Sequence, residues 1–216
     1  MPAPTSSLIE NMAKGALSGA GLQGKNIPDL AGAMGETIGQ ALNLFVSMAM
    51  VSPGIPAAAD PITGSGSTVG PGMLMPPPAG GPDASQIEGI AKGMVSSKQL
   101  LGENAPGLAK ALAQSTAQAI LLFTSMVQVA PGIAIAGFVT AAPGMLAGAA
   151  PAKPMLQPIV MGFLQAEGLR GKNAPDLAGA IAETLANALS TLMTMVQVTP
   201  GIAASPAATG SPGRLV

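Results

Sequence analysis

The sequence predicts an α+β fold, mainly α, built from three tandem copies of a unit that reads helix, helix, short strand, turn, short strand. One observation behind this prediction is a repeat without gaps, in which the proline of an Asn-x-Pro tripeptide precedes a Pro-Gly-Ile tripeptide by 25 positions in every copy. Another is a change of period inside each copy, from helical spacing of apolar residues to alternation. The paired tripeptides are Asn26-Ile27-Pro28 with Pro53-Gly54-Ile55, Asn104-Ala105-Pro106 with Pro131-Gly132-Ile133, and Asn173-Ala174-Pro175 with Pro200-Gly201-Ile202.

The repeat and the composition between its copies divide the chain into five parts. Repeat 1 covers residues 1–74, repeat 2 covers 86–148 and repeat 3 covers 155–216, with Pro/Gly linkers at 75–85 and 149–154. Linkers of this composition are extended spacers without a core of their own. Because one copy buries too little apolar surface to offset the entropy of ordering it, we expect the copies to pack together. They would stack in a row or close around a pseudo-threefold axis.

The first helix of each copy is predicted from apolar residues at helical spacing. In repeat 1 these residues are Leu8, Ile9, Met12 and Ala16. A loop that contains glycine, residues 21–25 in this copy, then separates the first helix from the second.

The second helix of each copy is predicted to start at the asparagine of the Asn-x-Pro tripeptide. We expect the side-chain oxygens of Asn26, Asn104 and Asn173 to accept hydrogen bonds from first-turn amides, with the following proline at a position where its missing N–H is harmless. Asp29 and Asp176 add negative charge at the positive end of the helix dipole. An apolar stripe at steps of four and three continues the helix in repeat 1 through Leu30, Met34, Ile38, Leu42, Phe45 and Met48.

Short strands are predicted after the second helix. Residues 126–129 and 195–198 alternate apolar and polar side chains, and the Pro-Gly that follows ends the strand before a second one at 133–136 or 202–204. A further Pro-Gly closes each copy. Repeat 1 alone carries extra residues around 63–67, between its two Pro-Gly turns.

Composition argues against several classes of function. A net charge of -1 with 9% charged residues gives no basic surface for nucleic acid. The chain has no Cys, His, Trp or Tyr, which removes the commonest nucleophile, general base and metal ligand. The chain is therefore predicted not to be an enzyme, with no catalytic, cofactor-binding or metal-binding residues and no cofactor. We interpret Glu36 and Glu183 as polar helix surface, and we expect no phosphate loop at Lys25 or Lys172, whose neighbours lack its spacing.

The strand segments supply the candidate interface residues. Unpaired strand edges are natural docking points for a partner by strand addition. The candidate protein-interface residues are Val51, Val129, Val198, Ile55, Ile133 and Ile202. The alternative function is that of a membrane-inserting or membrane-perforating protein, because residues 111–152 and 184–213 carry no charge. Pro-Gly interruptions argue against this alternative, since they would strand backbone polar groups in lipid.

The ends of repeats 2 and 3 resemble a family of proteins. Residues 127–134 and 196–203, together with the tail at 211–215, are similar to small virion structural proteins of tailed bacteriophages. The resemblance implies a non-enzymatic virion protein of the tail or baseplate, an adaptor between rings of different symmetry. Its partners would be other structural proteins of a large assembly, with a homo-oligomer as a further option and no nucleic acid. The implied location is the virion, with the bacterial cytoplasm or membrane, and hence membrane contact, as alternatives.

Overall fold

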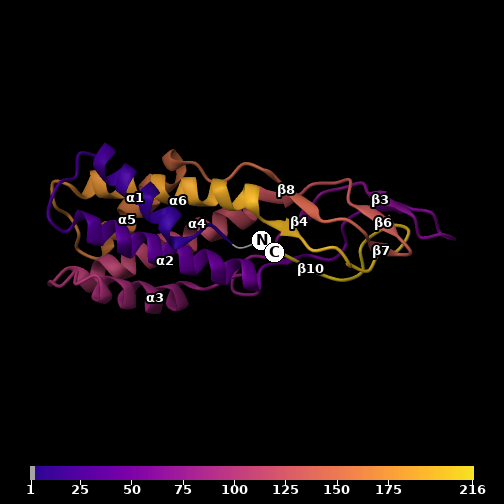
Figure 1. The fold of residues 1–216 in the computed structure, drawn as a ribbon, viewed down its shortest axis with the longest axis horizontal. Helices are drawn as coiled ribbons and strands as arrows, with labels where there is room; N and C mark the ends of the chain where they lie inside the picture. The colour runs from indigo at the N-terminus through magenta and orange to yellow at the C-terminus, as the bar shows by residue number, and fades with distance from the viewer. Residues whose placement is uncertain (1–2) are drawn as a thin grey trace.

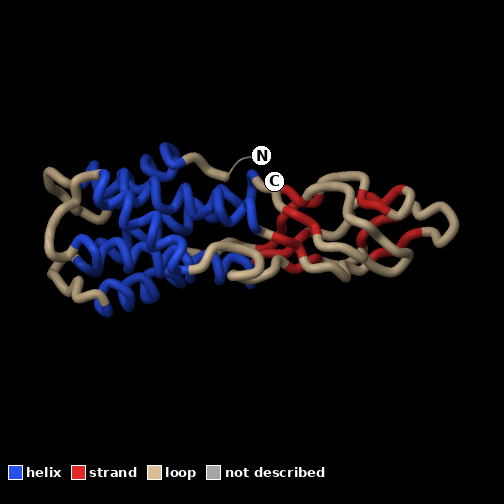
Figure 2. The backbone as a smooth tube through the Cα atoms, turned by 90° about the horizontal axis from the view of Figure 1, so that it is seen from below, coloured by secondary structure: helices blue, strands red, loops and turns tan. Residues whose placement is uncertain are grey.

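The computed structural model describes residues 3–216 as an elongated molecule with helices at one end and strands at the other. Figure 1 shows that the C-terminus lies near the middle of the long axis, where the two regions join. Figure 2 shows the same division from a second side. The fold is α+β, as predicted, and half of the chain is helical.

Helices of 14 and 22 residues alternate along the described chain. Each short helix is followed by a long one, and the loops between them lie together at the outer end of the helical region (Figure 1). The helices are α1 (Ser6–Gly19), α2 (Ile27–Met48), α3 (Ala84–Ser97), α4 (Ala105–Met126), α5 (Lys153–Ala166) and α6 (Ala174–Met195). Thus α3 and α5 begin inside the segments that the sequence assigned to linkers.

The helix starts are stabilised in two different ways. Thr5 and Asp83 cap α1 and α3 with their side chains, and Asp83 forms a complete capping box with Gln86. The three asparagines occupy the N-cap positions of α2, α4 and α6, as predicted, but none of their side chains makes a capping hydrogen bond. The prediction that the asparagine side chains cap these helices was therefore wrong. The local signal for the start of each long helix is the proline in its first turn, whose φ is fixed at a helical value.

The helices pack as a closed arrangement. Each short helix contacts its own long partner and one long helix of another hairpin: α1 lies against α6, α3 against α2 and α5 against α4. The long helices α2, α4 and α6 also contact one another. Because the first helix meets the last, no helix is left at the end of a row.

The strands are short and entirely antiparallel. They are β1 (Met50–Val51), β2 (Ala57–Ala59), β3 (Gly66–Thr68), β4 (Gly72–Met73), β5 (Val127–Val129), β6 (Ala134–Ala136), β7 (Val139–Thr140), β8 (Gly144–Gly148), β9 (Gln197–Val198) and β10 (Gly213–Arg214). The alternation of apolar and polar residues predicted β5 and β6 correctly. The return strands β7 and β8 were not predicted, because runs of two to five residues carry little periodic signal.

The strands form two closed rings. In the inner ring, next to the helices, β4-β5-β8-β9 is one sheet and β1-β10 is another. Isolated bridges from Val51 to Leu74 and from Val198 to Leu215 join the two sheets into a cycle. In the outer ring, isolated bridges at Pro56 and Val139 join the two edges of the sheet β2-β3-β6-β7 to residues of repeat 3. A bridge at Ala204, within repeat 3, completes the ring. Closure matters because strands this short would be marginal as isolated hairpins.

The core runs from the helices into the inner ring. Phe45 and Phe123 meet edge to face with ring centres 6.0 Å apart, and both are fully buried. The same cluster includes Val51, Val129 and Val198, whereas Ala57 and Ile135 of the outer ring are buried outside it. The inner ring therefore shares its apolar interior with the helices, and the outer ring is a thinner extension.

The two Pro-Gly turns of each copy need glycine for different reasons. The glycine of the first turn has positive φ, as in Gly54 at 90°, where a side chain would be strained. The glycine of the second turn has no such φ. A Cβ on Gly144 would lie 2.6 Å from Ile133 Cδ1 and 3.2 Å from Val198 Cβ, so its absence lets the strand press against the core.

Candidate interaction surfaces

The six predicted interface residues lie inside the β region. The three valines sit in or beside the inner ring, and the three isoleucines follow the first Pro-Gly turn of each copy. All six side chains are buried: Val51, Val129, Val198, Ile55, Ile133 and Ile202. They contact other segments of the same chain, so they form the apolar interior of the β half, residues 49–75, 127–150 and 196–216.

The expectation of free strand edges at these residues is corrected by the structure. β5 pairs with β4 on one side and β8 on the other. β1 and β9 are likewise bonded on both sides, each by a ladder on one side and by an isolated bridge on the other. Strand addition at the valine segments would require one of these pairings to open first.

Three buried threonines that were not among the predicted site residues connect the repeats in a cycle. The Ile133 N–H donates to Thr68 Oγ1 over 3.0 Å, from repeat 2 to repeat 1. The Ile202 N–H donates to Thr140 Oγ1 over 2.9 Å, and the Ile55 N–H to Thr209 Oγ1 over 3.0 Å. Each of the three isoleucine N–H groups is buried and needs an acceptor. We call these three hydrogen bonds the threonine clasps. They hold each repeat to the next.

A sequence signal for the threonine clasps existed. Each of the three threonines stands three positions before the proline of the second Pro-Gly turn, at Pro71, Pro143 and Pro212. The pattern Thr-x-x-Pro-Gly therefore recurs in every copy, and a polar residue kept at one position among varied small residues indicates a buried hydrogen bond.

Charged residues differ between the three contacts that a short helix makes with a long helix of another hairpin. Where α5 packs on α4, Lys110 Nζ lies 2.8 Å from Glu167 Oε1, and this carboxylate raises the pKa of Lys110. Where α3 packs on α2, Lys98 lies across Gly32, with its Cε 2.9 Å from where a Cβ would be. The α1–α6 interface has Ala20 and Gly179 at the corresponding positions. The charge differences between copies thus correspond to different neighbours within the chain.

The polar residues considered as possible acid–base groups lie apart from one another. Glu183 pairs with Lys153 over 2.7 Å across α5 and α6. Gln114, at the site equivalent to Glu36, is half-buried, and its Oε1 has no hydrogen-bond partner among the described residues. Within residues 3–216 there is no group of three or more Asp, Glu, Cys or His side chains that could hold a metal ion.

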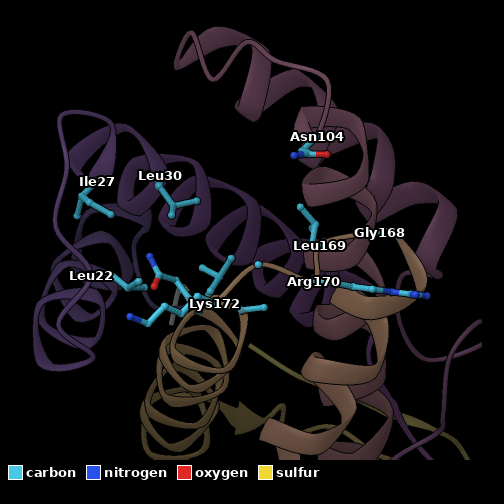
Figure 3. A pocket seen from close by; sticks show the side chains of 12 residues that line it. Leu22, Ile27, Leu30, Asn104, Gly168, Leu169, Arg170 and Lys172 are labelled. Atoms are coloured by element: carbon cyan, nitrogen blue, oxygen red, sulfur yellow. The ribbon is translucent and has the colours of Figure 1, made fainter.

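A hollow of about 560 Å³ lies at the outer end of the helices. Its floor is apolar and comes from the loops and long helices of repeats 1 and 3 (Figure 3). The apolar residues that define this end hollow are Leu22, Ile27, Leu30, Leu169 and Leu177. Its charged lining residues are Arg170 and Lys172, both cations. A neighbouring hollow of about 300 Å³ shares Ile27 and Leu30 and adds Lys25.

The opposite end of the molecule is formed by the loop between β2 and β3, residues 60–65, here called the tip loop (Figure 1). Ile62 is 88% exposed, more than any other large apolar side chain described. Asp60 Oδ1 accepts hydrogen bonds from Thr63 N at 2.7 Å and Ile62 N at 2.8 Å, which lower the pKa of its carboxyl group. The Phe138 N–H donates to Gly64 O over 3.2 Å, so the tip loop rests on the turn of repeat 2.

Comparisons with protein-family models, curated proteins and solved structures found no significant match. None of the helices in the described part of the chain has both the length and the apolar character needed to cross a membrane.

Proposed function

We propose that this chain is a non-enzymatic structural protein of a large assembly, a phage virion component of the tail or baseplate type that acts as an adaptor. In this proposal the repeats are three tandem copies of one unit arranged around a pseudo-threefold axis. The threonine clasps are the observation that supports it most directly, because they run from repeat 1 to 2, from 2 to 3 and from 3 back to 1.

A closed arrangement of this kind suits a mechanical role. The helices close through α1 and α6, and both strand rings close through bridges between repeats. Backbone hydrogen bonds and bridges connect segments that are far apart in sequence. Rigidity of this origin is useful in a particle part and does not require a catalytic cluster.

The unequal charges support the adaptor role. Three identical repeats would offer a partner three identical faces, whereas here one pair of equivalent positions holds Lys110 with Glu167 in one helix contact, Lys98 with Gly32 in the second, and Ala20 with Gly179 in the third. One chain could therefore match a threefold neighbour through its backbone shape and still present distinct side faces to others.

Co-sedimentation with particles tests the proposal. Phage particles from cells that express the chain are purified through a density gradient and analysed by quantitative mass spectrometry. We expect the chain at a fixed ratio to the other particle proteins through successive gradients. A chain that separates from the particles, or whose ratio falls with each step, would contradict the proposal. Liposome flotation is the matched control, because a structural protein remains in the aqueous fraction.

A further inference from the structure

The two ends of the long axis are complementary in shape and charge. One end is the tip loop, with the protruding apolar side chain of Ile62 beside the carboxylate of Asp60. The other end is the end hollow, with an apolar floor and the cation Lys172 at its side in Figure 3. Both lie at the extremes of an elongated molecule (Figure 1), so each is accessible to another molecule in line with it.

We propose that copies of this chain associate head to tail, the tip loop of one copy entering the end hollow of the next. This inference rests on the proposed structural role and names a partner for it. A contact between two different surfaces of the same molecule is heterologous, and it produces open linear or helical stacks unless the rotation closes a ring.

The tip loop is built as a rigid projection. From Pro53 to Pro71 repeat 1 spans 18 positions, against 12 from Pro131 to Pro143 and from Pro200 to Pro212, so its hairpin reaches beyond the other two. Three hydrogen bonds to Asp60 Oδ1 and the contact of Gly64 with Phe138 fix the loop. Because the loop is already ordered, Ile62 can be buried in a partner at little entropic cost.

The charges favour a second copy as the occupant. Asp60 is the only charged residue of the outer ring and its loops, and Arg214 in β10 is the only other one in the whole β half. All charged residues that line the end hollow and its neighbour are cations, namely Lys25, Arg170 and Lys172. The carboxylates Asp29, Glu103 and Asp176 are near in sequence but do not line either hollow. The tip of one copy therefore brings its single negative charge to a positive rim.

The contact is small, so its strength in solution is low. Interfaces that bury less than about 1,200 Å² belong to weak and transient complexes. In a stack held within a particle, the effective concentration of neighbouring ends makes even a weak contact persistent. The pure protein should therefore show association only at high concentration.

Sedimentation velocity on the full chain tests the proposal, from about 10 µM to about 1 mM. We expect the mean sedimentation coefficient of the wild type to rise continuously with concentration. Ile62→Glu should remain monomeric, and so should the double variant Lys25→Glu/Lys172→Glu. Val69→Glu, at an exposed site away from the tip, and Lys14→Glu/Lys153→Glu, with the same change in net charge, should associate like the wild type. Circular dichroism confirms that each variant is folded.

Mixing gives the decisive result. The Ile62→Glu variant keeps a functional hollow and the Lys25→Glu/Lys172→Glu variant keeps a functional tip, so an equimolar mixture should form a 1:1 dimer that does not grow. A wild type that stays monomeric, variants that associate like the wild type, or a mixture that either fails to pair or grows beyond a dimer would overturn the proposal. The wild type could prove monomeric in solution while the Lys25→Glu/Lys172→Glu variant is lost from particles. That result would mean that a different partner occupies the end hollow, and it would leave the proposed structural role intact.

Discussion

The helical half, α1 to α6, and the β half, residues 49–75, 127–150 and 196–216, are stabilised in different ways. The helical half carries nearly all the charge of the chain on its surface and buries large side chains such as Phe45, Met34 and Leu112. The β half has two charged residues and strands of two to five residues made mostly of small side chains. Its order comes from backbone pairing that closes on itself. Short strands are therefore stable here because helices fix their spacing and closure leaves no free edge.

The strongest way to break the β half is to place a charge in the interior that it shares with the helices. Val129→Asp should cost more than about 4 kcal/mol, because a buried carboxylate without a partner is among the most destabilising changes. We expect urea unfolding followed by circular dichroism to show helix loss in the same transition. Val139→Asp, at a site that is 43% exposed, is the matched control and should change little. Helix loss at the same urea midpoint as in the wild type would show that the two halves unfold independently.

The threonine clasps test how far closure depends on side chains. Thr68→Val keeps the size of the residue but leaves the buried Ile133 N–H without its acceptor, which should cost about 1–3 kcal/mol. The exchange rate of the Ile133 amide hydrogen should increase by the factor that corresponds to this free energy. Thr68→Ser retains the hydroxyl group and should recover most of the loss. Equal destabilisation by serine and valine would assign the effect to the methyl group instead.

Close backbone contact in the helical half can be tested at a single glycine. A Cβ on Gly35 of α2 would lie 2.7 Å from the Glu10 backbone of α1, so Gly35→Ala should force the helices apart. Overpacking should lower the free energy of unfolding by about 2 kcal/mol, and the better helix propensity of alanine should raise it by about 1 kcal/mol. The net loss of stability should therefore be about 1 kcal/mol. Gly15→Ala, where a Cβ meets nothing within 4 Å, should stabilise the protein instead. Thermal unfolding of both variants checks the opposite signs.

The smallest predicted effect concerns buried hydroxyl groups between the helices. Thr37 Oγ1 has no hydrogen-bond partner among the described residues, whereas the equivalent Thr184 Oγ1 donates to Ala180 O over 2.8 Å. Thr37→Val should therefore stabilise the protein by up to about 1 kcal/mol, because it removes an unsatisfied polar group. Thr184→Val should give no such gain. The urea midpoints of the two variants compare them directly. A lower midpoint for Thr37→Val than for the wild type would mean that the Thr37 hydroxyl group has a hydrogen-bond partner in solution.

Prediction from the sequence succeeded where the signal was local and repeated. The long helices begin at residues 27, 105 and 174, directly after the asparagines, because a first-turn proline and an apolar stripe at helical spacing act within a few residues. The role of the asparagine side chains was predicted wrongly, since capping depends on a rotamer and a backbone angle that sequence does not fix. The return strands β7 and β8 were missed because pairing partners, and not their own residues, make them strands.

The candidate surfaces show the same limit. Val129 and Ile133 were recognised as special from their repetition, but a repeated apolar residue can face a partner protein or the interior, and only the ring closure shows that it is the interior. The end hollow and the tip loop were beyond prediction as a pair, because Ile62 and Leu169 are far apart in sequence and at opposite ends of the molecule.

The helices, the turns and the recurrence of their sequence pattern follow from residues that lie close together in the chain. The contact of α1 with α6, the closure of the strands into two rings and the hydrogen bond from the Ile55 N–H to Thr209 depend on the fold as a whole. These are choices among pairings of distant segments. They are fixed by the sum of many weak contacts, each of which satisfies a backbone group that no neighbour in sequence could reach.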